Sequence, residues 1–224
     1  RNRCAINQGC FVSRPVIAVL DYGIGNLRSA EKALQKVGGD ARLTRDPAFV
    51  ESADAVVLPG VGAFGACMDA LRGAGLEDVV YGAVDSGRPF LGICVGMQML
   101  FTSSQEDLDA RGLDIISGTV KWIPPGVKRP QMQWNKLSFT QPDDAMFEGE
   151  LLRDAPNGSW VYFVHSLHGV PMDPSLVAAT CDYGVTLNAA FRQDNVFATQ
   201  FHPEKSGASG LALLDNFVKA AGAS

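Results

Sequence analysis

Two short segments of the chain carry residue types that could make and break a covalent bond. Gly92-Ile93-Cys94-Val95-Gly96 has the G-x-nucleophile-x-G pattern of a sharp strand-to-helix turn, with cysteine in the nucleophile position. Such a turn lifts the sulfur to the N-terminus of a helix, where unpaired N–H groups and the helix dipole favour a thiolate. For these five residues alone a buried structural cysteine is the better explanation, because free cysteines are commonly buried. The apolar strand and helix expected on either side make the two interpretations about equal.

A thiol nucleophile generally needs a general base, and the base needs a group that orients it. The chain has three histidines, His165, His168 and His202. His202 follows an apolar run and is separated from Glu204 only by a proline, so its ring and the carboxylate can turn to the same side. We therefore favour His202 as the base and Glu204 as its orienting group. His165, at the end of another expected strand, is the alternative, and His168 is assigned to a turn.

Further polar or flexible groups lie beside these candidates. Pro59-Gly60-Val61-Gly62 follows an apolar run directly, and its glycines would let the backbone approach a ligand or point N–H groups into a cavity. Taken alone, this segment is better explained as a plain loop between a strand and a helix. Gln98 lies four residues after Cys94, on the same face of the expected helix. If Gln98 is buried, its amide needs partners, which a substrate or the backbone could provide.

The elements that must position these residues alternate between strand and helix. Continuous apolar runs predict buried strands, and apolar residues at helical spacing predict helices between them. The expected strands cover residues 16–20, 41–44, 55–58 and 89–93. We call the sharp turn at Cys94 the elbow, and the elbow helix that follows it is expected to run from Val95 through Phe101. This order predicts an α/β fold with a mainly parallel central sheet and helices on both faces. Gly60, Gly62 and Cys94 follow strand ends, where such sheets bind ligands, and this favours catalysis over a structural cysteine.

The pattern changes after residue 112. Short strands separated by Pro, Gly and Asp turns predict an additional antiparallel section or a second small sheet. They are expected at residues 115–116, 119–122, 136–139, 160–164, 176–181, 186–192 and 196–200, before a closing helix at 207–220. No composition break marks a linker, so we expect residues 15–224 to form a single domain. Residues 1–14 are expected to be an N-terminal extension or a cloning remnant.

Composition excludes several classes of protein. The net charge is −5 and there is no basic run, which argues against a nucleic-acid partner. No apolar stretch reaches the length needed to span a bilayer. The five cysteines are odd in number and include no C-x-x-C pair, which argues against a disulfide framework or a zinc site and favours a reducing cytoplasm.

With these segments placed, residues 16–220 closely resemble the class I, triad-type glutamine amidotransferases. The resemblance rests on three blocks, residues 58–62, 91–98 and 200–204. It implies that Cys94, His202 and Glu204 hydrolyse glutamine to glutamate and ammonia through a thioester, without a metal or an organic cofactor. It also implies an oxyanion hole formed by Gly60, Val61, Gly62 and Val95. The substrate site that it implies includes Gln98 and Ser166.

Four further segments narrow the resemblance to the glutaminase subunits of imidazole glycerol phosphate synthase, in histidine biosynthesis: residues 21–29, 59–64, 162–166 and 202–206. The implied partner is the cyclase subunit, a (β/α)8 barrel, in a heterodimer. The chain contains no barrel, so we expect a separate subunit. Two positions depart from the family pattern. Gln133 takes the place of the glycine in the usual Met-Gly-Trp-Asn, and Leu167 takes the place of the aromatic residue that usually follows His-Ser. Both departures bear on partner contact or on substrate positioning.

Three alternative functions share some of these features. A glutaminase subunit serving anthranilate or pyridoxal phosphate synthesis would have the same triad but should lack the flanking segments. A thiol esterase or peptidase would cleave other substrates without a partner. A non-catalytic binding subunit would have lost a triad residue, and Cys94, His202 and Glu204 are all present.

Overall fold

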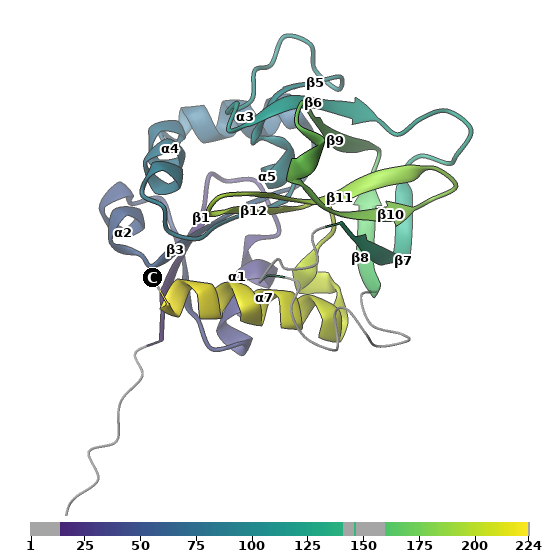
Figure 1. Ribbon diagram of the computed structural model, residues 1–224. Coiled ribbons are helices and arrows are strands. Elements are labelled where there is room, and N and C mark those ends of the chain that lie inside the picture. The colour runs from purple at the N-terminus through teal and green to yellow at the C-terminus, as the bar shows by residue number, and fades with distance from the viewer. Residues whose placement is uncertain (1–13, 141–145, 147–159, 224) are drawn as a thin grey trace, which may run out of the picture.

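The computed structural model of the chain describes residues 14–140, 146 and 160–223, and the fold below refers to these residues. The expected extension at residues 1–14 therefore lies outside the described residues, apart from Arg14. The described chain forms a nine-stranded mixed sheet with a three-stranded sheet beside it, as Figure 1 shows.

The half of the large sheet that carries the elbow is parallel. Its strands lie in the order β2-β1-β3-β4-β12, and each pairs in parallel with its neighbour. They are β1 (Val16–Leu20), β2 (Asp40–Thr44), β3 (Ala55–Gly60), β4 (Phe90–Cys94) and β12 (Val196–Thr199). Strands β3, β4 and β12 are buried throughout, which is why they read as unbroken apolar runs.

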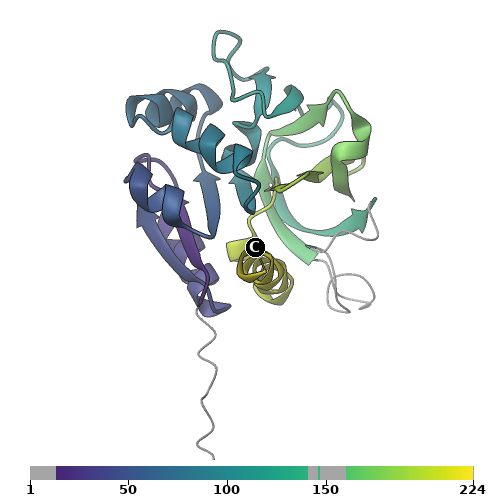
Figure 2. The ribbon, with the colours of Figure 1, turned by 60° about the vertical axis from the view of Figure 1, so that its left-hand side comes forward.

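Helices cover both faces of this parallel half, as predicted. Helices α1 (Leu27–Lys36) and α7 (Gly207–Gly222) lie on one face, and α3 (Phe64–Gly73) and α4 (Glu77–Asp85) lie on the other (Figures 1 and 2). The short helix α2 (Pro47–Ser52) begins at a proline after Asp46, whose carboxylate accepts the Ala48 N–H. Within the described ranges, every helix is too short or too polar to cross a membrane.

Both arrangements expected for the second half occur together. Strand β12 pairs antiparallel with β11, and the antiparallel part of the large sheet continues in the order β11-β10-β7-β8. These strands are β7 (Gln131–Phe139), β8 (Trp160–His165), β10 (Val177–Asp182) and β11 (Thr186–Gln193). The small sheet has the order β5-β6-β9, formed by β5 (Phe101–Ser104), β6 (Ile116–Trp122) and β9 (Leu167–Pro171). Two 3-10 turns complete the fold, η2 (Pro174–Leu176) and η3 (Pro203–Lys205).

The structure corrects two expectations about local structure. The elbow helix, α5 (Val95–Gln98), does not run through Phe101, which instead begins strand β5. Phe101 is fully buried by stacking edge-on against Phe191 of β11, at 5.2 Å between ring centroids, and over Gly169, where a side chain would overlap its ring. Its apolar character therefore reports contact between the two sheets rather than a helix. His168 lies within strand β9, not in a turn.

A backbone contact between the elbow and strand β3 fixes two of the glycines. A Cβ atom built on Gly96 would lie 1.9 Å from the carbonyl oxygen of Leu58, and one on Gly60 would lie 2.5 Å from the Gly96 nitrogen. Real Cβ atoms do not approach other atoms so closely, so both positions admit only glycine unless the backbone moves. The elbow therefore sits against β3 with no side chain between the two.

Replacing Gly96 by alanine should destabilise the protein. Overpacking of a buried site costs about 1–3 kcal/mol, and the upper end is expected here because the clash is with backbone. Gly82→Ala is the matched control, because Gly82 lies inside helix α4 with open space around it. That substitution should raise the unfolding free energy by about 0.5–1 kcal/mol. Urea unfolding of both variants checks the prediction, and equal effects of the two substitutions would contradict it.

Candidate active site

The register of the parallel strands brings the sequence candidates together. Gly60 pairs with Cys94 at the end of the β3–β4 ladder, and Thr199 pairs with Ile93 at the end of the β4–β12 ladder. The segment Pro59-Gly60-Val61-Gly62, called the glycine segment below, thus lies on one side of Cys94. The chain that continues from β12 to His202 lies on the other side. These segments are far apart in sequence, and only the sheet order makes them neighbours.

Cys94 has the backbone of a strained elbow. Its φ is +56° and its ψ is −114°, in a region that residues other than glycine rarely adopt. The side chain is 5% exposed and stands at the N-terminal end of α5, which has only four residues. A single turn carries a smaller dipole than the longer helix expected from the sequence. Other groups must therefore supply much of any stabilisation of a thiolate.

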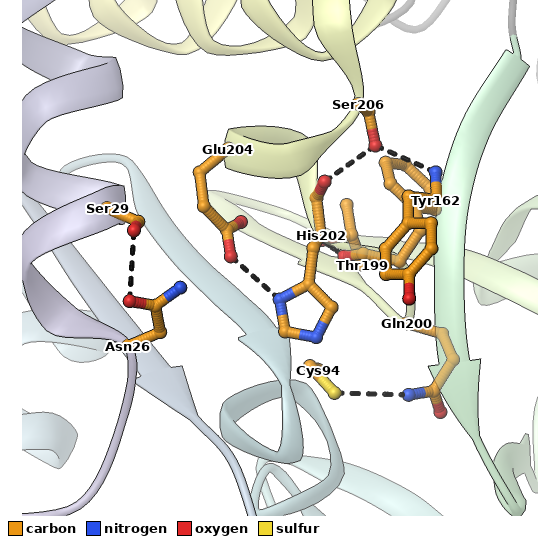
Figure 3. Close-up of polar contacts among 10 residues, drawn as sticks. Asn26, Ser29, Cys94, Tyr162, Thr199, Gln200, His202, Glu204 and Ser206 are labelled. Carbon is orange, nitrogen blue, oxygen red and sulfur yellow. Dashed lines mark hydrogen bonds and ion pairs between the residues drawn. The ribbon is translucent and has the colours of Figure 1, made fainter. Parts of the chain in front are cut away.

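His202 connects the sulfur to a carboxylate. Its Nδ1 lies 2.7 Å from Glu204 Oε1, both side chains are only 3% exposed, and its Nε2 points toward the sulfur of Cys94 (Figure 3). Burial alone would lower the pKa of His202, but hydrogen bonds with Cys94 and Glu204 and their negative charge outweigh burial and raise it to about 9. Both partners therefore favour the protonated form of the ring, as a group that accepts the thiol proton requires.

Strand β8 holds the backbone of His202 in place. The His202 N–H donates to the carbonyl oxygen of Tyr162 at 3.1 Å. The Ser206 hydroxyl donates to the His202 carbonyl at 2.6 Å and accepts the Tyr162 N–H at 3.0 Å (Figure 3). Ser206 is 1% exposed, so these are buried hydrogen bonds. The position of the ring is thus set by the β8 strand as well as by Glu204.

The two other histidines are placed differently. His165 Nδ1 lies 2.7 Å from the Leu167 carbonyl oxygen and donates its proton there. Its Nε2 lies 2.8 Å from the side-chain amide of Gln131, so both ring nitrogens are already engaged. Burial lowers the pKa of His165 to about 4. Burial also lowers the pKa of His168 to about 4. Among the described residues, neither ring has a carboxylate partner like that of His202, so the geometry favours His202 as the base.

A cavity of about 300 Å³ opens onto the sulfur. Its lining includes the expected site residues Val61, Gly62, Cys94, Val95, Gln98, Ser166 and His202. Leu167, the departure from the family pattern, is also in the lining, together with Glu106, which the sequence analysis missed. Glu106 Oε2 accepts the Phe64 N–H at 2.7 Å. The available signal was its position just after strand β5, an element that the sequence analysis did not predict.

Gln98 is 3% exposed, and its amide nitrogen is bonded within the protein. That nitrogen donates to Gln200 Oε1 at 3.1 Å and to the Leu167 carbonyl oxygen at 3.5 Å. Only the oxygen of Gln98 remains to meet a ligand in the cavity. Gln200 itself is fully buried, and its amide nitrogen lies 3.8 Å from the sulfur of Cys94 (Figure 3). Gln200 was not among the site residues predicted from the sequence.

Two buried side chains hold the glycine segment from behind. The Tyr22 hydroxyl donates to the Pro59 carbonyl at 2.6 Å, and the Cys67 thiol donates to the Val61 carbonyl at 3.2 Å. Burial raises the pKa values of both the Tyr22 hydroxyl and the Cys67 thiol, so both groups keep their protons at neutral pH. No side chain among the described residues bonds the peptide between Gly60 and Val61, which lies between the two bonded carbonyls.

Glu204 commits one oxygen to His202, and its other oxygen, Oε2, is buried with no protein partner among the described residues. A very small cavity beside Glu204 is also lined by Asn26 and Gly60. The Asn26 side chain, which accepts the Ser29 hydroxyl at 2.9 Å, lies across from Glu204 in Figure 3. Within the described part of the chain, no group of three or more His, Cys, Asp or Glu residues is arranged to hold a metal ion.

Comparison with known proteins gives a consistent result. The family model "Glutamine amidotransferase class-I" matches residues 18–221. The chain is 50% identical to the imidazole glycerol phosphate synthase subunit HisH of Methanothermobacter thermautotrophicus over 204 residues, which cover 91% of this chain and 98% of that one. It is also 50% identical to the subunit of the same name from Syntrophotalea carbinolica over 209 residues, 90% of this chain and 98% of the relative.

Solved structures show the same fold at low sequence identity. A crystal structure described as a glutamine amidotransferase matches with a TM-score of 0.70 and 23% identity, over 92% of this chain and 98% of that one. The structure of PurLQS from Thermotoga maritima matches with the same TM-score and 19% identity, again over 92% and 98%.

The buried, neutral state of His165 predicts how stability depends on pH. Because its pKa is about 4 when folded and about 6.5 when unfolded, the unfolded chain gains a proton first as the pH falls. The stability from this group is thus complete above pH 6.5 and is lost as the pH falls toward 4. Between pH 7.5 and 5 the loss should be about 2 kcal/mol. Urea unfolding at both pH values should show a correspondingly smaller loss in His165→Asn; an identical loss would contradict the prediction.

Proposed function

The chain belongs to the class I glutamine amidotransferase family, and we propose that it acts as the glutaminase subunit of an imidazole glycerol phosphate synthase, with Cys94, His202 and Glu204 as its catalytic residues. One observation supports these three residues above all. The His202 ring lies between the Cys94 sulfur and the Glu204 carboxylate, with one ring nitrogen directed at each (Figure 3). The HisH relatives, matched over about nine-tenths of the chain, support the choice of synthase.

The first half of the reaction forms a thioester. His202 holds the proton that Cys94 gives up, since its pKa is about 9 and its Nε2 faces the sulfur. The sulfur attacks the carboxamide carbon of glutamine and forms a tetrahedral intermediate. His202 then delivers its proton to the departing nitrogen, and ammonia leaves as the C–N bond breaks. Glu204 keeps the ring in place and stabilises its positive charge.

The negative oxygen of the intermediate needs hydrogen-bond donors. Val95 is the first residue of α5, so its N–H has no partner within the helix. The glycine segment, paired beside Cys94 through Gly60, supplies the second donor from Gly60, Val61 or Gly62. In the second half of the reaction, His202 removes a proton from water. The resulting hydroxide attacks the thioester carbon, and glutamate and the Cys94 thiol are released.

Glutamine enters as a zwitterion with a neutral side-chain amide, and the lining of the cavity suits both parts. The Glu106 carboxylate, which lines the cavity, would pair with the substrate's ammonium group. The free oxygen of Gln98 can accept a further hydrogen bond, and Ser166 supplies polar atoms from the loop between β8 and β9.

Cys94→Ala should abolish glutamine hydrolysis while the protein stays folded, because no other thiol faces His202 in the described residues. The measurement is glutamate release by the purified variant together with its far-UV circular dichroism. Cys181→Ala is the matched control: Cys181 is also a buried free cysteine, but it contacts Gln131 instead of His202. Hydrolysis retained by folded Cys94→Ala, or lost equally in Cys181→Ala, would reject Cys94 as the nucleophile.

The partner surface that we propose includes the paired strands β7 and β8. Met132, Trp134 and Trp160 are large apolar residues of these strands, and they are 62%, 48% and 42% exposed. Gln133 lies between Met132 and Trp134 and is also exposed. The partner is the cyclase subunit, a (β/α)8 barrel, which would receive the ammonia within a heterodimer. The reaction would take place in the cytoplasm, which suits the buried free thiols of Cys67, Cys94 and Cys181.

Activity should depend on this partner through the glycine segment. Tyr22 and Cys67 hold the carbonyls of Pro59 and Val61, so rotation would be confined to the peptide between Gly60 and Val61. With its N–H toward the intermediate this peptide stabilises the oxyanion, and with its carbonyl there it does not. Removing one oxyanion donor elsewhere costs about 10²–10³ in rate, so the chain alone should be slower by a comparable factor.

The measurement is kcat for glutamine with the chain alone, with the barrel subunit, and with the barrel subunit and its nucleotide ligand. Tyr22→Phe and Cys67→Ala should change the ratio of these rates, because each removes one donor that limits the rotation. Equal rates in all three states would reject activation by rotation of the peptide between Gly60 and Val61. An unchanged ratio in both variants would mean that the activating change lies outside the glycine segment.

A further inference from the structure

We propose that Gln200 is an additional catalytic residue, whose amide N–H donates a hydrogen bond to the sulfur of Cys94 and stabilises its thiolate; this inference rests on the proposed role of Cys94 as nucleophile. Gln200 follows strand β12, two residues before His202, and is fully buried. Its amide nitrogen lies 3.8 Å from the Cys94 sulfur, within the longer range of hydrogen bonds to sulfur.

The orientation of the Gln200 amide follows from a chain of hydrogen bonds that begins at a backbone carbonyl. The carbonyl oxygen of Leu167 can only accept, so the part of the Gln98 amide that faces it must be the NH₂ group. The same NH₂ group faces Gln200, which must therefore present its oxygen there. The NH₂ group of Gln200 is then left to face the sulfur. Turning either amide over would bring two oxygens or two NH₂ groups together.

A hydrogen-bond donor that points at the sulfur stabilises the thiolate more than it stabilises the thiol. Hydrogen bonds to a charged acceptor are stronger than those to a neutral one, so the N–H of Gln200 favours the charged form. Helix α5 has only one turn to contribute. Because its side chain is a neutral amide, Gln200 can act on the sulfur without competing with His202 for the proton.

Alkylation of Cys94 by iodoacetamide tests the proposal without using glutamine turnover, because only the thiolate reacts. The full chain is treated at pH 6.5 and at pH 10, and mass spectrometry of peptides follows Cys94 separately from the other cysteines. Gln200→Met keeps the length of the side chain and removes the donor. It should slow alkylation about tenfold at pH 6.5, equivalent to one hydrogen bond to a charged group, and leave the rate within twofold at pH 10.

Two further variants make the test decisive. Gln131→Met removes another fully buried amide, one that contacts His165 and Cys181 and not Cys94, and it should keep the wild-type profile. Gln98→Leu removes the group that orients the Gln200 amide, so it should also slow alkylation at pH 6.5, and it serves as the test if Gln200→Met does not fold. An unchanged rate in folded Gln200→Met and Gln98→Leu, or an equal loss in Gln131→Met, would overturn the proposal.

Turnover separates this proposal from the proposed function. If the wild-type chain and its barrel partner hydrolyse glutamine, Gln200→Met should lower kcat about tenfold with little change in KM, because the amide acts on the nucleophile. If the wild-type complex does not hydrolyse glutamine but the alkylation profiles shift as described, the proposed function fails and the role of Gln200 toward the sulfur stands.

Discussion

The site depends on the bare backbone contact between strand β3 and the elbow that follows β4. At Gly96 and Gly60 a single carbon atom would meet main-chain atoms at 1.9 Å and 2.5 Å. Because no side chain separates the two segments, Gly60 pairs directly with Cys94, and the glycine segment comes within reach of any group bound to the sulfur. The strained backbone of Cys94, at a φ of +56°, is held by the same packing.

The parallel part of the fold could be predicted because its physical cause is local. Strands buried on both faces need unbroken apolar runs, and helices between them need apolar residues on one side only. The α/β class was confirmed, and the resemblance to class I glutamine amidotransferases was confirmed by the match over residues 18–221. The expectation for Phe101 was wrong because its burial comes from a contact with Phe191, 90 residues later, which no local periodicity records.

Candidate site residues could be chosen from the sequence where a residue type and its neighbours together restrict the chemistry. Cys94 between two glycines and His202 beside Pro203 and Glu204 are such cases, and the structure brings these three side chains together. Glu106 and Gln200 carry common side chains in unremarkable surroundings. Their relevance comes from which strand ends meet at the cavity, so it became visible only with the sheet order. Gln131, whose side chain contacts the ring of the alternative base His165, is likewise distant in sequence, so this contact became visible only in the fold.

The hydrogen bonds that join Tyr162 of β8 to His202 and Ser206 have a consequence for the edge of the large sheet. Strand β8 is the last strand on its side, and edge strands with free N–H and C=O groups can pair with strands of other molecules. Here the N–H and the carbonyl of Tyr162 are both taken by Ser206 and His202. The turn that carries His202 thereby also blocks strand addition at the middle of this edge. A substitution that loosens the turn would open a surface for self-association, so displacement of His202 and aggregation would arise from one structural change.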